Sequence, residues 1–210
     1  MLCRTVRTAS FIYYGKQGKM IIGDPYKFAF IIDLVPYWNE QYNTKNGIFF
    51  FCMEGKLFPK EIDTAALDTD IYYFFEYQPS SLVTLPVNIF LFNMDKITAF
   101  KQMHNLSYPE ILDLSDVNDI IIYENHKCST LTIEDNHYYF YAVSNGNQVR
   151  ILGAEIIQKN IKNEIVYDIF DEVFEIVVSR DYIVDIVSKL KTFCDNNIAL
   201  CSSAPAGAGL

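Results

Sequence analysis

The chain has 210 residues, of which 50% are hydrophobic and 15% aromatic, and its net charge is −9. This length and composition predict one domain with a sizeable buried core. No apolar run reaches the roughly 18–20 residues that a membrane-spanning helix needs, which predicts a water-soluble protein. Residues 20–210 hold 13 basic and 26 acidic residues and therefore carry −13. This charge opposes nucleic-acid binding, because contacts with phosphate require lysine and arginine.

The two ends of the chain differ in composition from the part between them. Residues 1–19 contain four basic residues and no acid, and they lack the apolar core of a secretory signal. Residues 202–210, SSAPAGAGL, are mostly small and uncharged. We therefore expect a basic N-terminal extension at 1–19 outside the fold, a globular domain at 20–201, and a disordered tail at 202–210.

The first half of the domain combines strand and helix patterns. Phe28–Val35 is rich in Phe and Ile and predicts a strand that stops at Pro36. Gly47–Phe58 has an apolar arm, a Glu-Gly turn and a short return, which together predict a hairpin. Thr64–Tyr77 predicts a helix, and the two prolines of Gln78–Pro86 predict a loop.

The second half begins with a helix pattern and then turns to strand patterns. Asn93 is expected to cap a helix that runs to about Asn105. Cys128–Ile133 alternates weakly between apolar and polar residues, and Glu164–Asp168 and Glu172–Val178 are strand-like.

The C-terminal element has the clearest helix signature. Ser179 precedes Arg180–Asn197, in which apolar residues recur at helical spacing. Asp181 in the first turn and lysines towards the end complement the helix dipole. Arg180–Asn197 is therefore predicted to form an amphipathic helix that begins directly after Ser179.

The stretch YYFYAVSNGNQVRILG predicts a hairpin with arms Tyr138–Val143 and Gln148–Ile157. Asn145 and Gly146 are expected to supply the two positive-φ positions of its turn. Both faces of the arms carry apolar side chains, so we expect one face on the core and the other under a helix. Because strands outnumber helices, the chain predicts an α+β single domain, mainly an antiparallel sheet with two or three helices on one face.

No motif of catalytic or metal chemistry stands out. The five cysteines form no CxxC pair, the three histidines form no HExxH motif, and neither GxSxG nor a phosphate-binding glycine loop occurs. We therefore assign no catalytic residue, no cofactor and no metal ligand. The irregular cysteines are typical of reduced thiols in a cytoplasmic chain.

The acidic residues allow three interpretations: a solvated surface, a contact patch for a basic partner, or two carboxylates that converge in the cleft of a hydrolase. They are densest in Asp113–Asp119 and Asp168–Glu172. Trp38, the one tryptophan, lies in the predicted loop Pro36–Tyr42. In such a loop it can anchor a protein interface, although core packing is the alternative.

The chain contains four distinctive blocks in this order: MIIGDPYKFAFIIDLVPYW (Met20–Trp38), NGIFFFCMEGKLFP (Asn46–Pro59), TAALDTD (Thr64–Asp70) and YYFYAVSNGNQVRILGA (Tyr138–Ala154). In their order and in their amino-acid sequences, these blocks resemble the immunity protein 42 family, a family of bacterial polymorphic-toxin immunity proteins. The resemblance covers Met20 to about Asp195.

The resemblance implies a cytoplasmic, non-enzymatic protein that binds and neutralises a cognate bacterial toxin. The acidic charge suits a basic toxin, and we expect no nucleic-acid or membrane partner. The alternatives are a small carboxylate-dependent hydrolase and a non-catalytic adaptor or scaffold protein. The expected partner-binding residues are the aromatic and acidic side chains of the stretches above: Trp38, Glu40, Tyr42, Asp113, Asp116, Asp119, Asp168, Asp171 and Glu172.

Overall fold

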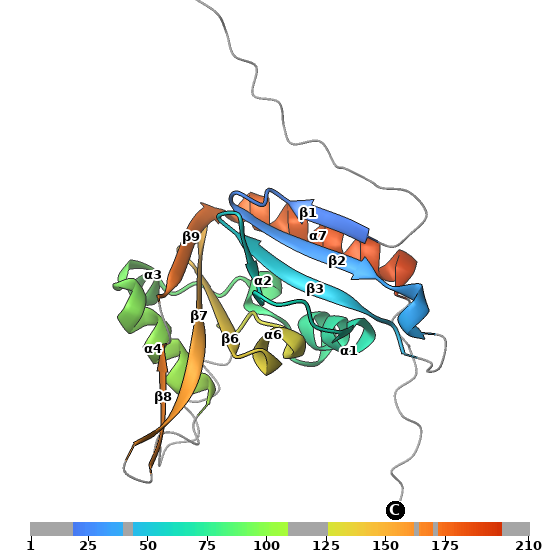
Figure 1. Ribbon diagram of the computed structural model, residues 1–210. Helices are drawn as coiled ribbons and strands as arrows, with labels where there is room; N and C mark the ends of the chain where they lie inside the picture. Colours follow the sequence, from blue (N-terminus) through green and yellow to red (C-terminus); the bar gives the residue numbers. More distant parts are fainter. Residues whose placement is uncertain (1–18, 40–43, 109–125, 162–163, 170–171, 199–210) are drawn as a thin grey trace, which may run out of the picture.

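The computed structural model describes residues 19–39, 44–108, 126–161, 164–169 and 172–198. These residues form two antiparallel sheets and six α-helices (Figure 1), which confirms the predicted α+β class. The helices are more numerous than expected, and the strands divide between two sheets. Residues 1–18 and the predicted tail lie outside the described residues, so the proposed domain boundaries stay predictions.

Sheet 1 contains the strand and the hairpin that the N-terminal half predicts. Its order is β1-β2-β3-β4, with all neighbours antiparallel, and β5 pairs with the start of β3. Phe30 of β2 lies opposite Phe51 of β3, so their rings share one face of the sheet. The strands are β1 (Lys19–Gly23), β2 (Phe28–Leu34), β3 (Asn46–Met53), β4 (Lys56–Phe58) and β5 (Ala65–Ala66).

Sheet 2 is built around one long strand, β7. The hairpin partner β6 pairs with one edge of β7, and β9 and β8 follow one another along the other edge. All pairings are antiparallel, and they confirm the hairpin and the strand-like segments predicted from the sequence. The strands are β6 (Tyr138–Ser144), β7 (Gln148–Ile161), β8 (Glu164–Ile169) and β9 (Phe174–Ser179).

The turn between β6 and β7 differs from the predicted one. Only Gly146 has a positive φ, whereas Asn145 does not. The Asn145 side chain instead accepts hydrogen bonds from the backbone N–H groups of Asn147 and Gln148. Asparagine therefore closes this turn through its carboxamide oxygen, which makes the second positive-φ position unnecessary.

The described helices are α1 (Leu67–Tyr72), α2 (Ser81–Thr84), α3 (Ile89–Asn93), α4 (Lys96–Ser107), α6 (Leu131–Asp135) and α7 (Arg180–Asn197). A π-helical turn, η2 (Tyr73–Tyr77), continues α1, so the helix predicted there is confirmed in outline. The C-terminal helix is confirmed as α7, and the Ser179 hydroxyl accepts from the Tyr182 N–H as its cap.

Three predictions about short elements are wrong, and in each case a capping side chain explains the result. The expected loop at 78–86 contains α2, which Ser80 caps. The weak strand pattern at 128–133 gives way to α6, because the Thr130 hydroxyl accepts from the Ile133 N–H. The helix expected to start at Asn93 starts later, with Asp95 as its cap, and the short α3 precedes it.

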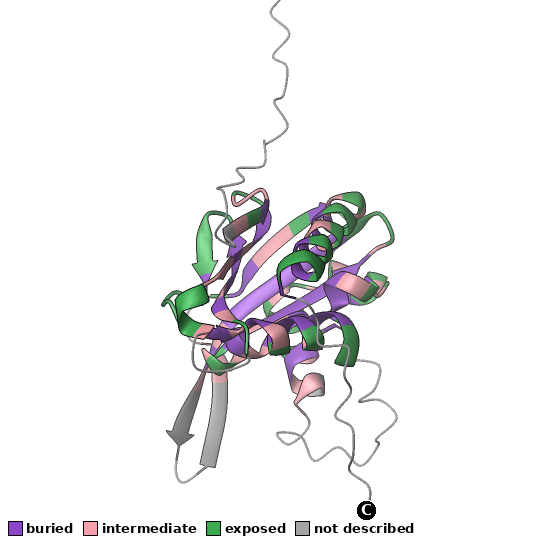
Figure 2. Cartoon of the chain, turned by 90° about the vertical axis from the view of Figure 1, so that its right-hand side faces the viewer, coloured by how far each residue is buried: buried purple, intermediate pink, exposed green. Residues whose placement is uncertain are grey.

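The main core lies between the two sheets, and it is rich in aromatic rings. Phe140 of β6 contacts Phe51 of β3 and Phe58 of β4, with ring centroids 5.1 and 5.3 Å apart. Helix α7 closes this core through its buried face, which includes Ile183 and Leu190. Figure 2 shows the buried residues gathered on the central strands, while the outward sides of the helices are exposed.

A second core lies on the other face of sheet 2. Tyr141 and Leu152 of the β6–β7 hairpin pack there with Leu91 of α3 and with Phe100 and Met103 of α4. The hairpin is therefore covered on both faces, which confirms the arrangement expected from its two apolar faces.

Gly153 shows how tightly the main core is packed. It lies opposite Phe140 in the β6–β7 register, and a Cβ atom at this position would approach the Phe140 ring to 2.1 Å. We predict that Gly153→Ala lowers the free energy of unfolding by about 1–3 kcal/mol, because the ring must leave its position. Urea denaturation measures this change, and an unaltered unfolding midpoint would contradict the packing argument.

Candidate functional site

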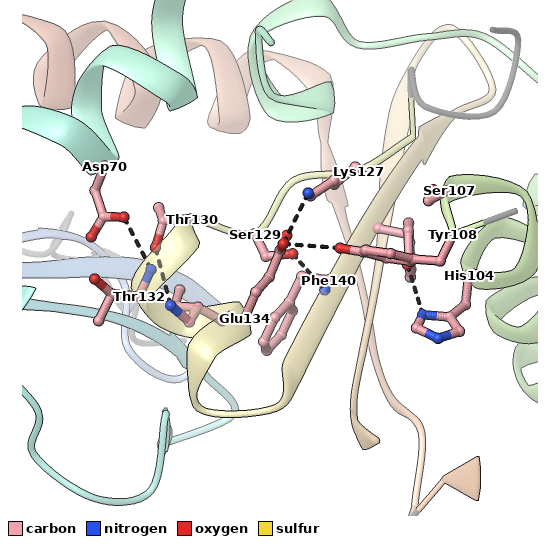
Figure 3. A network of polar contacts seen from close by, with 12 residues as sticks. Asp70, His104, Ser107, Tyr108, Lys127, Ser129, Thr130, Thr132, Glu134 and Phe140 are labelled. Carbon is pink, nitrogen blue, oxygen red and sulfur yellow. Dashed lines mark hydrogen bonds and ion pairs between the residues drawn. The ribbon is translucent and has the colours of Figure 1, made fainter. Parts of the chain in front are cut away.

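A cluster of polar side chains joins α4 to α6 and is called here the polar cluster: Tyr108, Lys127 and Glu134. Glu134 Oε2 accepts a hydrogen bond from the Tyr108 hydroxyl at 2.9 Å and an ion-paired N–H from Lys127 Nζ at 2.9 Å (Figure 3). Burial raises the pKa of Tyr108, so its hydroxyl stays protonated and able to donate. The Lys127 ammonium also lies over the Tyr108 ring, 5.3 Å from its centroid.

His104 lies beside the polar cluster but is enclosed by aromatic rings. Its Nδ1 is 3.0 Å from the Tyr141 hydroxyl, and the rings of Phe100, Tyr108 and Tyr139 surround the imidazole. Burial lowers the pKa of His104 to about 4, so the ring is neutral at pH 7. Because a general base must reach its substrate, this enclosed histidine has the geometry of a packing group.

A cavity of about 140 Å³ borders the polar cluster. Ligand pockets commonly measure about 300–1,000 Å³, so this cavity has room only for a small chemical group. Glu134 is the single carboxylate among its described lining residues. The lining residues are Tyr73, Gln78, Pro79, Ser80, Ser107, Lys127, Ser129, Leu131 and Glu134.

Asp70 is a second buried carboxylate, but it does not line this cavity. Its Oδ1 accepts the Thr132 backbone N–H at 3.1 Å, while Oδ2 is buried without a hydrogen-bond partner. Burial raises the pKa of Asp70 to about 6. Asp70 therefore links α1 to the start of α6. Elsewhere too, the described His, Cys, Asp and Glu side chains form no group of three that could bind a metal.

An exposed aromatic turn follows β2. The 3₁₀ helix η1 (Pro36–Asn39) presents Tyr37 at 80% exposure and Trp38 at 39% exposure. The Asn39 side chain fixes the turn: its amide donates to the Val35 carbonyl, and its oxygen accepts the Asn46 N–H at the start of β3. The two rings therefore project from a held backbone, and for Trp38 the structure favours exposure over core packing.

The structure separates the described members of the predicted partner-binding set. Trp38 follows the end of β2 that pairs with Gly47, whereas Glu172 pairs with Lys56 at the opposite end of sheet 1, at 3.0 Å. The Lys56 ammonium holds the pKa of Glu172 below its usual value. Asp168 is half-buried in β8. The remaining expected residues lie outside the described part of the chain: Glu40, Tyr42, Asp113, Asp116, Asp119 and Asp171.

Sequence reasoning missed a set of exposed apolar side chains on and around α3. Phe90 is 71% exposed, and Val87, Ile89 and Ile97 are also largely exposed. Alternation between exposed and buried residues over so short a helix gives no usable periodicity, because five residues make little more than one turn. Sequence reasoning also missed Arg150, which is only 4% exposed and whose guanidinium donates a hydrogen bond to the Leu91 carbonyl of α3.

Two antiparallel sheets with flanking helices place the chain in the α+β structural class. Among solved structures, CdiI from Burkholderia dolosa AUO158 has a similar fold, with a TM-score of 0.59 and 20% sequence identity. The match covers 81% of this chain and 99% of that chain. In the described residues, no helix is long and apolar enough to cross a lipid bilayer.

Sequence comparison then identifies the family. The profile of immunity protein 42 matches residues 20–193, and the chain belongs to this family. The resemblance found in the four sequence blocks is thereby confirmed. The protein is accordingly placed among the bacterial immunity proteins, a class associated with toxin neutralisation. A comparison with curated proteins found no match.

Replacing Asp70 by asparagine should stabilise the protein at neutral pH. The folded-state pKa of about 6 is above the value of 3.8 for a free carboxyl, so the native state binds this proton more tightly than the unfolded state does. The resulting stability is present below about pH 4 and is lost as the pH rises through 6. We predict that Asp70→Asn raises the free energy of unfolding at pH 7 by about 1–3 kcal/mol.

The gain should shrink as the pH falls from 7 towards 4, because the wild-type carboxyl then becomes neutral as well. Urea denaturation of both proteins across this pH range measures the difference. A gain that does not change with pH, or a loss of stability at pH 7, would contradict the assignment of Asp70 as a buried and poorly solvated carboxylate.

Proposed function

We propose that this chain is a cytoplasmic, non-enzymatic immunity protein that binds a cognate bacterial toxin and blocks its action. The observation that carries this proposal is the held aromatic turn of Tyr37 and Trp38, which presents two rings to a partner. Tryptophan and tyrosine dominate the binding energy of many protein interfaces. A backbone that is already fixed loses little entropy when it binds.

The partner is a protein toxin, and its binding surface is basic. The net charge of −9 supports this complementarity, since opposite charges on two proteins raise their rate of association. No nucleic acid, membrane or cofactor takes part. The acidic residues of the surface set the rate of encounter, and the aromatic side chains, which become buried only in the complex, set the rate of dissociation.

The proposed partner-binding residues are those expected from the sequence. Trp38 and Tyr42 supply aromatic rings, and Glu40, Asp113, Asp116, Asp119, Asp168, Asp171 and Glu172 supply negative charge. Trp38 and Glu172 lie at opposite ends of sheet 1. A partner that contacts both must therefore lie along the length of this sheet.

Co-expression tests the function directly. Cells that produce the toxin domain encoded beside this gene should survive when the full chain is present and die when it is absent. Survival should not require any catalytic turnover by the chain, so it should track the amount of complex that forms. Killing that continues despite abundant folded protein would end the proposal.

Trp38→Ala should weaken the complex with the toxin by about 2 kcal/mol, or roughly thirtyfold in Kd, mainly through faster dissociation. Val184→Ala is the control, because Val184 is 51% exposed on α7 and lies outside the proposed partner-binding set. Surface plasmon resonance measures both variants. Equal dissociation rates for Trp38→Ala and wild type would remove Trp38 from the interface.

A further inference from the structure

Three tyrosine rings project from the end of α1 and from η2, and they are called here the tyrosine face: Tyr72, Tyr73 and Tyr77. Their ring centroids are 6.0 Å apart for Tyr72 and Tyr73, 6.1 Å for Tyr72 and Tyr77, and 4.9 Å for Tyr73 and Tyr77. Tyr72 is 47% exposed and Tyr77 is 59% exposed, whereas Phe74 and Phe75 between them are buried. The three rings therefore form one aromatic patch on the outside of the fold.

The π-helical turn brings these rings together and holds them. On an α-helix, residues five apart point in different directions, because each residue advances by about 100°. The wider turn of η2 stacks residues five apart, so Tyr77 returns to the side of Tyr72. The same turn is anchored from below, since the Phe74 ring contacts Phe30 of β2 with centroids 5.8 Å apart. A patch on such a fixed backbone loses little entropy when a partner binds.

Carboxylates flank the tyrosine face on both sides. Asp68 precedes Tyr72 by four residues and Glu76 follows it by four, and residues at this spacing are neighbours on a helix surface. Glu76 pairs with Lys191 at 3.6 Å, but the two side chains are 52% and 47% exposed, so this ion pair contributes little and can exchange its partner. A cation over Tyr72 would therefore meet the electron-rich face of a ring and a carboxylate on either side.

The tyrosine face begins beside the turn that carries Trp38. The Asn46 side-chain amide donates to the Trp38 carbonyl, and the neighbouring Lys45 N–H donates to Asp68 at 3.4 Å. Asp68 is one helical turn before Tyr72. Helix α1 therefore starts at the end of sheet 1 where β2 ends and β3 begins (Figure 1). A protein seated on the exposed aromatic turn can extend from there onto the tyrosine face.

Arginine is the side chain whose chemistry matches this surface. Its guanidinium is planar, always charged and weakly hydrated, and it stacks on aromatic rings while it donates to carboxylates. The net charge of −9 also favours a basic partner. We propose that the tyrosine face binds an arginine side chain of the partner toxin, with the guanidinium over Tyr72 and Tyr77. Asp68 and Glu76 supply the counter-charge. This inference rests on the proposed function for the identity of the partner.

Paired substitutions separate the aromatic ring from mere apolar bulk. In surface plasmon resonance with the full-length chain and the toxin domain encoded beside its gene, Tyr72→Leu should weaken the complex about tenfold. Tyr72→Phe is the matched control, because it keeps the ring and should bind within about twofold of wild type. Urea denaturation verifies that both variants are folded, and Tyr77→Leu and Tyr77→Phe repeat the comparison at the more exposed ring. Equal affinities of the Leu and Phe variants at both positions overturn the inference.

The charge of the occupant is tested by two substitutions of opposite sign. Glu76→Gln removes a flanking carboxylate and should weaken the toxin complex about threefold. Lys191→Gln removes the cation that pairs with Glu76 and should strengthen the complex by a similar factor. Tighter binding by Glu76→Gln, or weaker binding by Lys191→Gln, shows that the occupant is not a cation and overturns the inference.

A double-mutant cycle identifies the arginine. Each arginine of the toxin domain is replaced by glutamine and measured against wild type and against Tyr72→Leu. One of these replacements should weaken binding to wild type about tenfold and should have little further effect on binding to Tyr72→Leu. The absence of any such coupled arginine overturns the inference.

Three further outcomes distinguish this inference from the proposed function. If wild type binds the toxin and all variants of the tyrosine face bind it equally well, the inference fails and the proposed function stands. If wild type does not bind the toxin, the proposed function fails, and the assignment of the arginine to the toxin fails with it. Sedimentation velocity of the free protein tests a second copy as the occupant, and a dimer that Tyr72→Leu dissociates would overturn the inference.

Discussion

The β6–β7 hairpin is apolar on both faces, and this single feature requires the rest of the molecule to form layers on either side of it. Phe140 and Ile151 face sheet 1, whereas Tyr141 and Leu152 face α3 and α4. Each such side chain contributes about 1.5–3 kcal/mol when it is buried. A sheet with one face open to water would forfeit half of these contributions. Sheet 2 therefore lies at the centre of the molecule, between two separate cores.

Covering the second face depends on a buried cation. The Arg150 guanidinium donates to the carbonyl groups of Leu91, Phe92 and Met94 at the end of α3, and its Nε donates to Glu175. These carbonyl groups have no partner within the helix, so the charge and the helix end satisfy each other. The short α3 is held in this way, and its exposed residues project from a fixed base.

The interior polar groups and the outer surface have separate roles in this fold. Inside, Glu134 joins α6 to α4 through Lys127 and Tyr108, next to a small cavity. Outside, Tyr37 and Trp38 stand on a turn that Asn39 ties to β3. For the outer turn we propose a role in protein recognition, in keeping with membership in the immunity protein 42 family.

The sequence by itself determined the elements whose signal is local: β2, the β3–β4 hairpin, the β6–β7 hairpin and α7. Short helices such as α2 and α6 were not predicted, because four or five residues show no helical periodicity of apolar side chains. Only a capping serine or threonine marks their start. Of the candidate site, the sequence indicated Trp38 but gave no sign of the cavity or of the α3 surface. Tertiary structure alone decided that Lys127 and Tyr108 meet at Glu134 and that Arg150 reaches α3. The physical reason is that local periodicity follows from neighbouring residues, whereas these contacts depend on how two sheets and their helices pack together.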